Sequence, residues 1–513
     1  MLLFETKSRN LAFSTRRRPK LILPSEIWIH ILSFLPDSDV VPLYRVNRLF
    51  YDVSMDSQYR HLSFCERKGF VLGRGCMSDD GLKKRIKAIT ISDTPLCVNA
   101  EVGFIPGPAQ YSPAEPTVRG RIRSFFGSTH TSMSQKPQSR NLTPPELISQ
   151  HILKVLDGAD NLEELRILHK YGPQEIFGQL TLYPICLALS NRHSLRRLHV
   201  EGHRLDSVLP LIRFCSLTSV SIAMRFTSEI WHTLGALPLF LKNVASSVEV
   251  LHVGALNGLH SGAISLAMTK IFCVLAMPNL RELATPLMVS PDSARVFDAF
   301  NSKYGSLTKL DLHLHAEDNP PNVPLSSLRL PQLQALSLNF VSEAAVPGLW
   351  RGRYEFPELQ ELRIDGRHLG LEEVASMCRF FAQTTIAVLS LRVSVLDGAL
   401  LSLLAASLPA LRDLSLFAAD LSKQHPDLTA RAMAHVVDHF KADIEERNFQ
   451  GWALKKVFVS LNGRVPWSRD SRLSPPHQIV AILARCIPSI QTTNCGYHNF
   501  EAPLYFSNGQ PTF

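Results

Sequence analysis

Several features that define large classes of protein are missing from this chain of 513 residues. Its nine cysteines are scattered and form no Cys-x-x-Cys pair, which argues against a disulfide framework and against a structural zinc site. No apolar run reaches the roughly 18 residues expected of a membrane span. Charged residues also interrupt the apolar start of the chain before a secretory core can form. We therefore expect a cytoplasmic or nuclear protein without a membrane partner.

Catalytic motifs are missing as well. The chain has no phosphate loop ending in Gly-Lys-Ser/Thr, no Gly-x-Gly-x-x-Gly, no His-Glu-x-x-His and no Gly-x-Ser-x-Gly. His313 and His315 share one face of an expected strand, but no third ligand accompanies them, so ordinary surface histidines are the favoured interpretation. Cys65 and Cys76 have no recognisable histidine partner. We expect that the protein is not an enzyme and uses neither a cofactor nor a metal.

Positive charge is concentrated in a small part of the chain. The formal net charge is +9, but residues 1–145 carry all of this excess and residues 146–513 are neutral in net terms. A groove for a phosphate backbone would have its lysines and arginines on the binding domain itself, so nucleic acid is not an expected partner. Arg16-Arg17-Arg18 with Lys20 fits a nuclear signal, although a solvated basic tail is the favoured interpretation.

The most informative feature that is present is an internal repeat from residue 146 onward. The repeated unit is apolar-x-x-apolar-x-apolar, usually with leucine at its first two positions. Between Leu280 and Leu411 the units start 27, 26, 26, 27 and 25 residues apart. The units begin at Leu162, Leu195, Leu217, Val248, Leu280, Leu307, Leu333, Leu359, Ile386, Leu411 and Leu454, and a weaker copy begins at Ile490.

The spacing within each unit predicts a strand. Alternate side chains of a strand point the same way, so the fourth and sixth positions of the unit face one interior, and the charged residues between them face solvent or a partner. Several strands are entered through an apolar-Pro-x-apolar step such as Leu408-Pro409-Ala410-Leu411, where proline stops the preceding helix. Helical patterns at 371–382 and 428–446 separate strands. This alternation predicts an α/β fold, a curved parallel sheet with helices on its convex side.

The repeat resembles the leucine-rich repeat over about two thirds of the chain. The resemblance implies an irregular solenoid, in which stacked repeats share one continuous core. The match to that family's consensus is incomplete. Its bracing asparagine is replaced here by His203, Arg367, Ser394 and Ala419.

A separate helical pattern occupies residues 21–64. Ile27, Ile31 and Leu35 stack at positions i, i+4 and i+8 of an expected helix, which Pro36 should end. The string resembles the F-box, with Leu-Pro-x-Glu, an Ile-x-x-x-Leu helix, a Leu-Pro step, an Asp and then Val-Asn-Arg-x-Phe. The resemblance assigns nine residues to the module's small core or to contact with the Skp adaptor: Leu23, Pro24, Glu26, Ile27, Ile31, Leu35, Pro36, Val46 and Phe50.

These patterns predict five segments. Residues 1–20 form a flexible basic lead-in and 21–64 the F-box, or alternatively a helical cap that seals the first repeat. Residues 65–98 form a connector with the first strand of the solenoid, at 86–91. Residues 99–145, rich in Pro and Ser, form a disordered insertion because they cannot bury enough apolar surface. Residues 146–513 form the leucine-rich-repeat domain.

The combination implies the substrate receptor of an SCF ubiquitin ligase, linked through the Skp adaptor to cullin and RING, with an unknown target protein on the repeats. The composition is also similar to that of fungal F-box proteins. A repeat scaffold without ligase activity is the alternative, and an enzyme or nucleic-acid binder is disfavoured. Five arginines at strand gaps could contact an acidic or phosphorylated target, although solvated charge is the simpler explanation. These are Arg166, Arg196, Arg281, Arg363 and Arg412.

Overall fold

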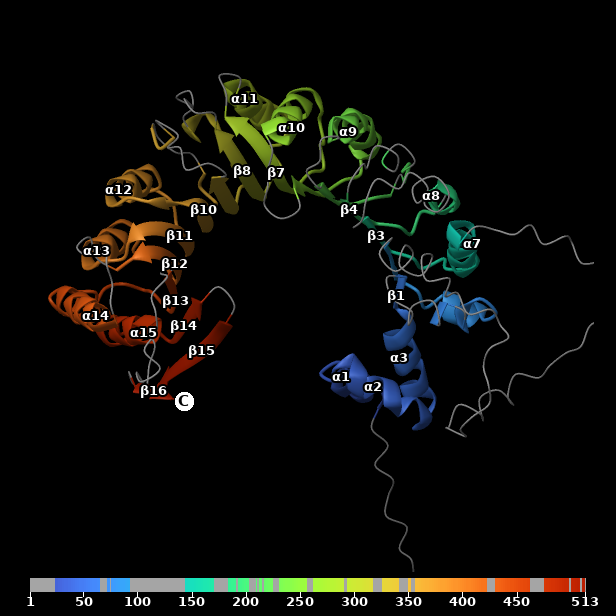
Figure 1. The fold of residues 1–513 in the computed structure, drawn as a ribbon, viewed down its shortest axis with the longest axis horizontal. Coiled ribbons are helices and arrows are strands. Elements are labelled where there is room, and N and C mark those ends of the chain that lie inside the picture. Colours follow the sequence, from blue (N-terminus) through green and yellow to red (C-terminus); the bar gives the residue numbers. More distant parts are fainter. Residues whose placement is uncertain are drawn as a thin grey trace, which may run out of the picture. The chain divides into compact units, whose positions relative to one another are not determined.

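The chain divides into two units, Met1–His61 and Leu62–Phe513. Figure 1 shows the fold in a computed structural model. The predicted lead-in, Leu23 and residues 99–143 of the predicted insertion at 99–145 lie outside the described residues, and the last two residues of that insertion begin a helix at Pro144. The structure describes residues 24–64, 72–73, 75–92, 144–169, 183–190, 192–202, 209, 212–214, 216–224, 230–255, 262–289, 293–316, 325–340, 349–351, 356–421, 430–461, 475–497, 500–507 and 510–512.

The first unit consists of short helices, and two prolines determine where two of them start. The carbonyl oxygen of Pro24 accepts hydrogen bonds from Ile27 N (3.1 Å) and Trp28 N (3.3 Å) and opens the first helix. That helix ends four residues before Pro36, whose carbonyl instead opens the second helix, so the expected stop was placed too late. The elements are α1 (Ser25–Leu32), α2 (Asp37–Val40), the 3-10 helix η1 (Val41–Arg45) and α3 (Arg48–Tyr59).

A small apolar core holds this unit together. Leu32, Val40 and Phe50 are buried at its centre, and Trp28 lies edge-on to Phe50 with ring centroids 5.3 Å apart. Two polar contacts fix α3 against this core. The Asn47 side chain caps the helix by accepting a hydrogen bond from Phe50 N at 3.0 Å. The buried Ser54 hydroxyl donates to the carbonyl oxygen of Val40 at 2.8 Å.

The second unit is built on one long sheet, in which strands follow one another in chain order. Every neighbouring pair from β2 to β14 is parallel, and β15 and β16 add an antiparallel edge. The strands are β1 (His61–Phe64), β2 (Ala88–Ser92), β3 (Glu164–His169), β4 (Arg197–Gly202), β5 (Ser219–Met224), β6 (Val250–Ala255), β7 (Glu282–Val289), β8 (Lys309–Ala316), β9 (Ala335–Phe340), β10 (Glu361–Leu369), β11 (Val388–Val395), β12 (Asp413–Asp420), β13 (Lys456–Leu461), β14 (Thr492–Tyr497), β15 (Phe500–Ser507) and β16 (Gln510–Thr512).

Helices alternate with these strands and cover one side of the sheet, the convex side (Figure 1). The predicted helices at 371–382 and 428–446 are α12 and α14, so the expected α/β solenoid-like arrangement is confirmed. The helical elements are α5 (Asp80–Lys83), α7 (Pro144–Leu156), α8 (Tyr183–Leu189), α9 (Ile230–Val244), α10 (Gly262–Val274), α11 (Ser293–Lys303), the 3-10 helix η7 (Leu325–Ser327), α12 (Leu371–Phe380), α13 (Gly398–Ser407), α14 (Ala430–Glu445) and α15 (Pro475–Cys486).

The sheet begins one strand earlier than the sequence pattern indicated. The expected first strand at 86–91 is β2, and β1 precedes it in the sheet order. Leu62 and Phe64 of β1 are fully buried, as the alternation of a strand requires. A run of four residues is too short to stand out as a pattern in the sequence.

The predicted repeat unit sets the register of the sheet. The second apolar position of each unit lies beside its counterpart on the next strand, as in Leu310 beside Leu336 and Leu336 beside Leu362. These residues are 0–1% exposed. Stacking of identical positions gives the core continuity along the whole sheet, which a single repeat could not provide.

The proline steps close turns at the entrance to the strands. Leu411 N donates to the carbonyl oxygen of Leu408 across Pro409 at 3.1 Å, and the same bond joins Leu280 to Met277 and Leu333 to Leu330, also at 3.1 Å. Proline suits the second position of such a turn because its φ is already fixed there. The apolar-Pro-x-apolar turn therefore ends a helix and directs the backbone into the next strand.

Strand β10 departs from the regular repeat at a bulge. Gly366 has a φ of +91°, and a Cβ atom there would lie 1.9 Å from the carbonyl oxygen of Phe340 on β9. The next residue, Arg367, is buried and stands where the consensus has its asparagine. Its guanidinium lies 2.6 Å from a carboxylate oxygen of Glu373, whose other oxygen accepts the Gly370 N–H at 3.2 Å. An arginine–glutamate pair thus braces this turn in place of asparagine.

Candidate interaction surfaces

Helix α1 has two apolar faces, and only one of them is buried. Trp28 and Leu32 pack in the core of the first unit. On the adjacent face, Ile27 is 45% exposed and Ile31 is 41% exposed, and Phe34 in the following turn is 75% exposed. These three residues follow the spacing of one helical stripe. We refer to Ile27, Ile31, Phe34 and Leu35 as the outward stripe.

The structure divides the predicted adaptor-contact residues between the surface and the core. Phe50 is 6% exposed and belongs to the core of the first unit. Leu23 lies outside the described residues. The exposed members are Pro24, Glu26, Ile27, Ile31, Leu35, Pro36 and Val46.

Sequence reasoning missed three exposed apolar residues of this unit, Ile29, Phe34 and Tyr51. Phe34 follows the same i, i+3 and i+4 spacing as Ile27 and Ile31, so the helical periodicity could have found it. Ile29 points to another side of the helix, because a step of two residues turns an α-helix by roughly 200°.

The second unit presents a contrasting surface on the side of the sheet that carries no helices. Its outward positions alternate with the buried leucines and bear polar side chains. Most of its cations face a carboxylate on the same or a neighbouring strand, which neutralises charge within the surface. The ion pairs are Lys87–Glu163 (3.0 Å), Arg197–Glu164 (3.4 Å), Lys309–Glu282 (3.6 Å), Lys456–Asp413 (3.2 Å), Arg166–Glu164, Arg363–Glu361 and Arg392–Asp365.

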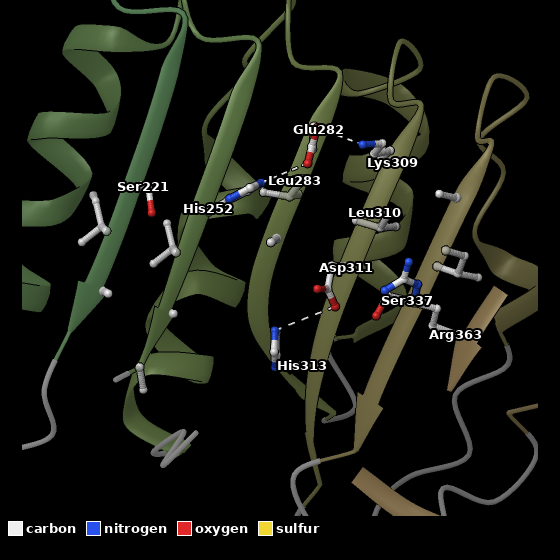
Figure 2. Close-up of a pocket in the computed structure, with 18 of the residues that line it drawn as sticks. Ser221, His252, Glu282, Leu283, Lys309, Leu310, Asp311, His313, Ser337 and Arg363 are labelled. Atoms are coloured by element: carbon white, nitrogen blue, oxygen red, sulfur yellow. Dashed lines mark hydrogen bonds and ion pairs between the residues drawn. The ribbon is translucent and has the colours of Figure 1, made fainter. Parts of the chain in front are cut away.

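A hollow of about 460 Å³ lies on this face and spans β5 to β10 (Figure 2). Small side chains make the depression, because Gly254, Ala284 and Ser337 occupy outward positions where longer residues would fill it. Charged residues surround them, including Glu282, Asp311 and Lys309. We call this depression the central hollow.

Two charge clusters occupy the central hollow (Figure 2). Glu282 lies between two cation-forming groups, with His252 Nε2 at 3.2 Å and Lys309 Nζ at 3.6 Å. Asp311 has a longer contact, to His313 Nε2 at 3.8 Å. One oxygen of Asp311, Oδ1, is buried and accepts no hydrogen bond from the described residues.

A smaller hollow of about 290 Å³ lies over β3 to β5 and contains His199. The Nδ1 atom of His199 lies 3.0 Å from the Ser221 hydroxyl, and Nε2 lies 3.7 Å from Glu201. Burial lowers the pKa of His199, outweighing the opposite effect of the Glu201 carboxylate. The neutral imidazole is therefore favoured.

An aromatic ridge stands on the same face further along the sheet. Phe417 on β12 and Phe458 on β13 are outward residues, half-buried, with ring centroids 5.4 Å apart. Arg392 lies over the Phe417 ring at 5.9 Å and also pairs with Asp365. Aromatic and arginine side chains are enriched at protein–protein interfaces.

The five predicted target-contact arginines are all exposed. Arg166 and Arg363 occupy the same outward row, on β3 and β10, and each pairs with a glutamate of its own strand. Arg196, Arg281 and Arg412 lie in the turns immediately before β4, β7 and β12. The structure therefore does not bring all five together into one patch.

The thiols offer little reactivity among the described residues. Burial raises the pKa of Cys76 to about 11, with the Asp79 carboxylate adding to the effect, and raises that of Cys186 to about 12. Both thiols are protonated at neutral pH and so are poor nucleophiles. Cys65 lies outside the described residues. The described part of the chain contains no group of three His, Cys, Asp or Glu side chains arranged to hold a metal ion, and His313 and His315 form no such group.

Comparison with known proteins identifies the first unit. Residues 21–65 match the F-box-like family model, so the chain carries an F-box-like domain there, followed by a repeat-like parallel sheet. F-box domains generally bind the Skp adaptor. No curated protein matches the chain. Among the helices that the structure describes, none has the length and apolar character of a membrane span.

Proposed function

We propose that this protein is the substrate receptor of an SCF-type ubiquitin ligase. Its F-box-like domain binds the Skp adaptor, which links it to cullin and RING, and the second unit binds the target protein. The F-box-like match at residues 21–65, together with the exposed outward stripe of the same segment, is the observation that carries the proposal.

The outward stripe supports a permanent partner. A module of this size buries little apolar surface, yet Ile27, Ile31 and Phe34 expose large apolar side chains. Exposed apolar side chains clustered on one helix face mark protein interaction sites. Fully burying one such side chain contributes roughly 1.5–3 kcal/mol, and covering the exposed 41–45% of Ile27 and Ile31 contributes correspondingly less for each.

The helix-free face of the sheet is the surface that we assign to the target. Its outward rows run across neighbouring strands and combine the central hollow with the ridge of Phe417 and Phe458. We propose that the sheet is a leucine-rich-repeat solenoid, of the kind found in fungal F-box proteins, that works in the cytoplasm or nucleus. Contact of the five arginines with the target remains a prediction: if it is correct, replacing all five with alanine weakens target capture, and unchanged capture would refute it.

The proposed mechanism is proximity. The receptor holds its target beside a ubiquitin-charged enzyme and so raises the effective concentration of the target's lysines. It supplies no catalytic group of its own.

The test is recovery of the adaptor and cullin with the full chain. We expect both to copurify with the wild-type protein and to be lost from an Ile27→Asp, Ile31→Asp variant, because a carboxylate cannot be buried without a partner in an apolar interface. Ile29→Asp is the matched control, since Ile29 is equally apolar and 50% exposed but lies off the stripe. Absence of the adaptor from the folded wild-type protein would refute the proposal. Recovery of the adaptor without cullin would favour a scaffold without ligase activity.

A further inference from the structure

The central hollow contains a half-exposed carboxylate, Asp311, whose side chain is 42% exposed and has one long ion-pair contact. Asp311 is the outward residue of β8 between Ala284 on β7 and Ser337 on β9, so small side chains flank it on both sides. Its ion-pair contact is the imidazole of His313, at 3.8 Å. Its Oδ1 atom is buried and accepts no hydrogen bond from the described residues. Buried oxygens ordinarily have a partner, and because the side chain as a whole is 42% exposed, a cation from solvent can reach this carboxylate.

The neighbouring cations are engaged elsewhere. Lys309 pairs with Glu282 at 3.6 Å, and Arg363 pairs with Glu361 on its own strand. The lining of the hollow thus contains three carboxylates and two permanent cations, an excess of one negative charge when the histidines are neutral. The unmatched carboxylate is Asp311.

We propose that the central hollow receives a lysine or arginine side chain from an extended segment of the target protein. The cationic group lies against Asp311, and its aliphatic stem covers Ala284 beside it. Ser337 on the other flank is also small, and its hydroxyl can accept a hydrogen bond from the head group. This inference names the class of target that the proposed receptor binds, and so rests on the proposed function.

An extended segment fits the shape of the hollow better than a compact ligand does. Six neighbouring strands line it, β5 to β10, which corresponds to roughly 24 Å at a strand spacing of about 4.8 Å. Its charged groups lie on β7, β8 and β10, with histidines on β6 and β8 (Figure 2). An acidic or phosphorylated segment would have to separate Lys309 from Glu282 and Arg363 from Glu361 and would lie beside Asp311, which disfavours it.

The experiment selects 12-residue peptides from a random phage-displayed library on the purified full chain. We expect the enriched peptides to share a lysine or arginine at one aligned position. A synthetic copy of an enriched peptide should bind about tenfold more weakly to Asp311→Asn than to the wild-type protein. The matched control is Asp413→Asn, an outward aspartate of β12 outside the hollow that pairs with Lys456 at 3.2 Å. It should leave the affinity unchanged.

A second measurement leaves the protein unaltered. Replacing the shared basic residue of the peptide with glutamine should reduce binding to the wild-type chain by the same factor, and should have no further effect on Asp311→Asn. Selection of acidic peptides would overturn the proposal and favour the exposed arginines instead. Failure to enrich any peptide, or equal binding to the wild type and to Asp311→Asn, would also overturn it.

These outcomes are separate from those of the adaptor experiment. Selection uses the chain alone, so loss of Skp recovery with intact peptide binding would refute the ligase role and leave the hollow as a peptide site. Recovery of adaptor and cullin without selection of basic peptides would support the ligase role and refute the peptide site in the hollow.

Discussion

The two units expose opposite kinds of surface. The first places Ile27, Ile31 and Phe34 in solvent, whereas the second buries its leucines and exposes a polar face on which most cations are paired. Permanent interfaces are apolar, and interfaces that form and separate are more polar. Under the proposed function, the apolar stripe suits the F-box-like domain to a lasting partner, and the polar face suits the sheet to targets that bind and leave.

The largest effect should come from breaking the core of the small unit. Phe50→Ala removes the ring that packs against Trp28, and such a change typically costs about 3–5 kcal/mol. A domain of this size has little stability to lose. We expect limited proteolysis to cut within residues 24–61 of the variant while fragments of the second unit persist. Simultaneous loss of the second unit would show that the two do not fold independently.

The corresponding test of the second unit is Gly366→Val at the bulge of β10. A side chain there meets the Phe340 carbonyl and a left-handed backbone at once, so we expect a loss of about 3 kcal/mol or more in the free energy of unfolding. Because repeats contact mainly their neighbours, hydrogen exchange should accelerate around β9 to β11 before it does elsewhere. Gly305→Ala is the control, since nothing lies within 4 Å of a Cβ atom at that position.

The next effect concerns binding alone. Ile31→Asp should weaken binding of the purified Skp adaptor by at least about a hundredfold, equivalent to about 2.7 kcal/mol, because it places an unpaired carboxylate in an apolar contact. Ile29→Asp should change the affinity far less. Isothermal calorimetry gives both values, and circular dichroism should show unchanged folding. Equal losses for the two variants would mean that the stripe has no special role.

The smallest effect is a pH dependence of the second unit. The pKa of His199 is lowered in the folded state, so the unfolded chain takes up a proton that the folded chain resists. Stability from this residue is therefore present above the ordinary histidine pKa of about 6.5 and is lost as the pH falls through it. We expect His199→Gln to reduce the difference in Tm between about pH 7.5 and about pH 5.5. An unchanged difference would exclude His199 as the source.

Sequence patterns predicted the repeating fold well because each repeat carries its own signal. Leu310, Leu336 and Leu362 occupy the same position in three successive repeats, and in the structure they lie side by side on neighbouring strands. Strand β1 was not predicted because its four residues contain less than one repeat unit. The bulge at Gly366 could not be predicted because it depends on the approach of β9, and the pairing of Arg367 with Glu373 because it joins a strand to a helix.

The candidate surfaces were predictable only in part. Ile27 and Ile31 could be singled out from the F-box resemblance, but that resemblance does not distinguish core from surface, and Phe50 proved to be core. The central hollow could not be foreseen. It arises because small residues from separate repeats, Ala284 and Ser337, flank Asp311. That these three residues are neighbours can be recognised only when the register of the strands is known.

The paired charges on the sheet also bear on how fast a target can arrive. Association is accelerated when one protein attracts another over a distance of roughly a Debye length, about 8–10 Å at physiological salt. A surface on which Lys309 faces Glu282 and Lys456 faces Asp413 has little field at that range. Encounter should then proceed at the ordinary rate of about 10⁵–10⁷ M⁻¹s⁻¹, with little dependence on ionic strength. If the protein is the proposed receptor, it discriminates its targets by how long they remain bound, and residence time also sets the opportunity for ubiquitin transfer.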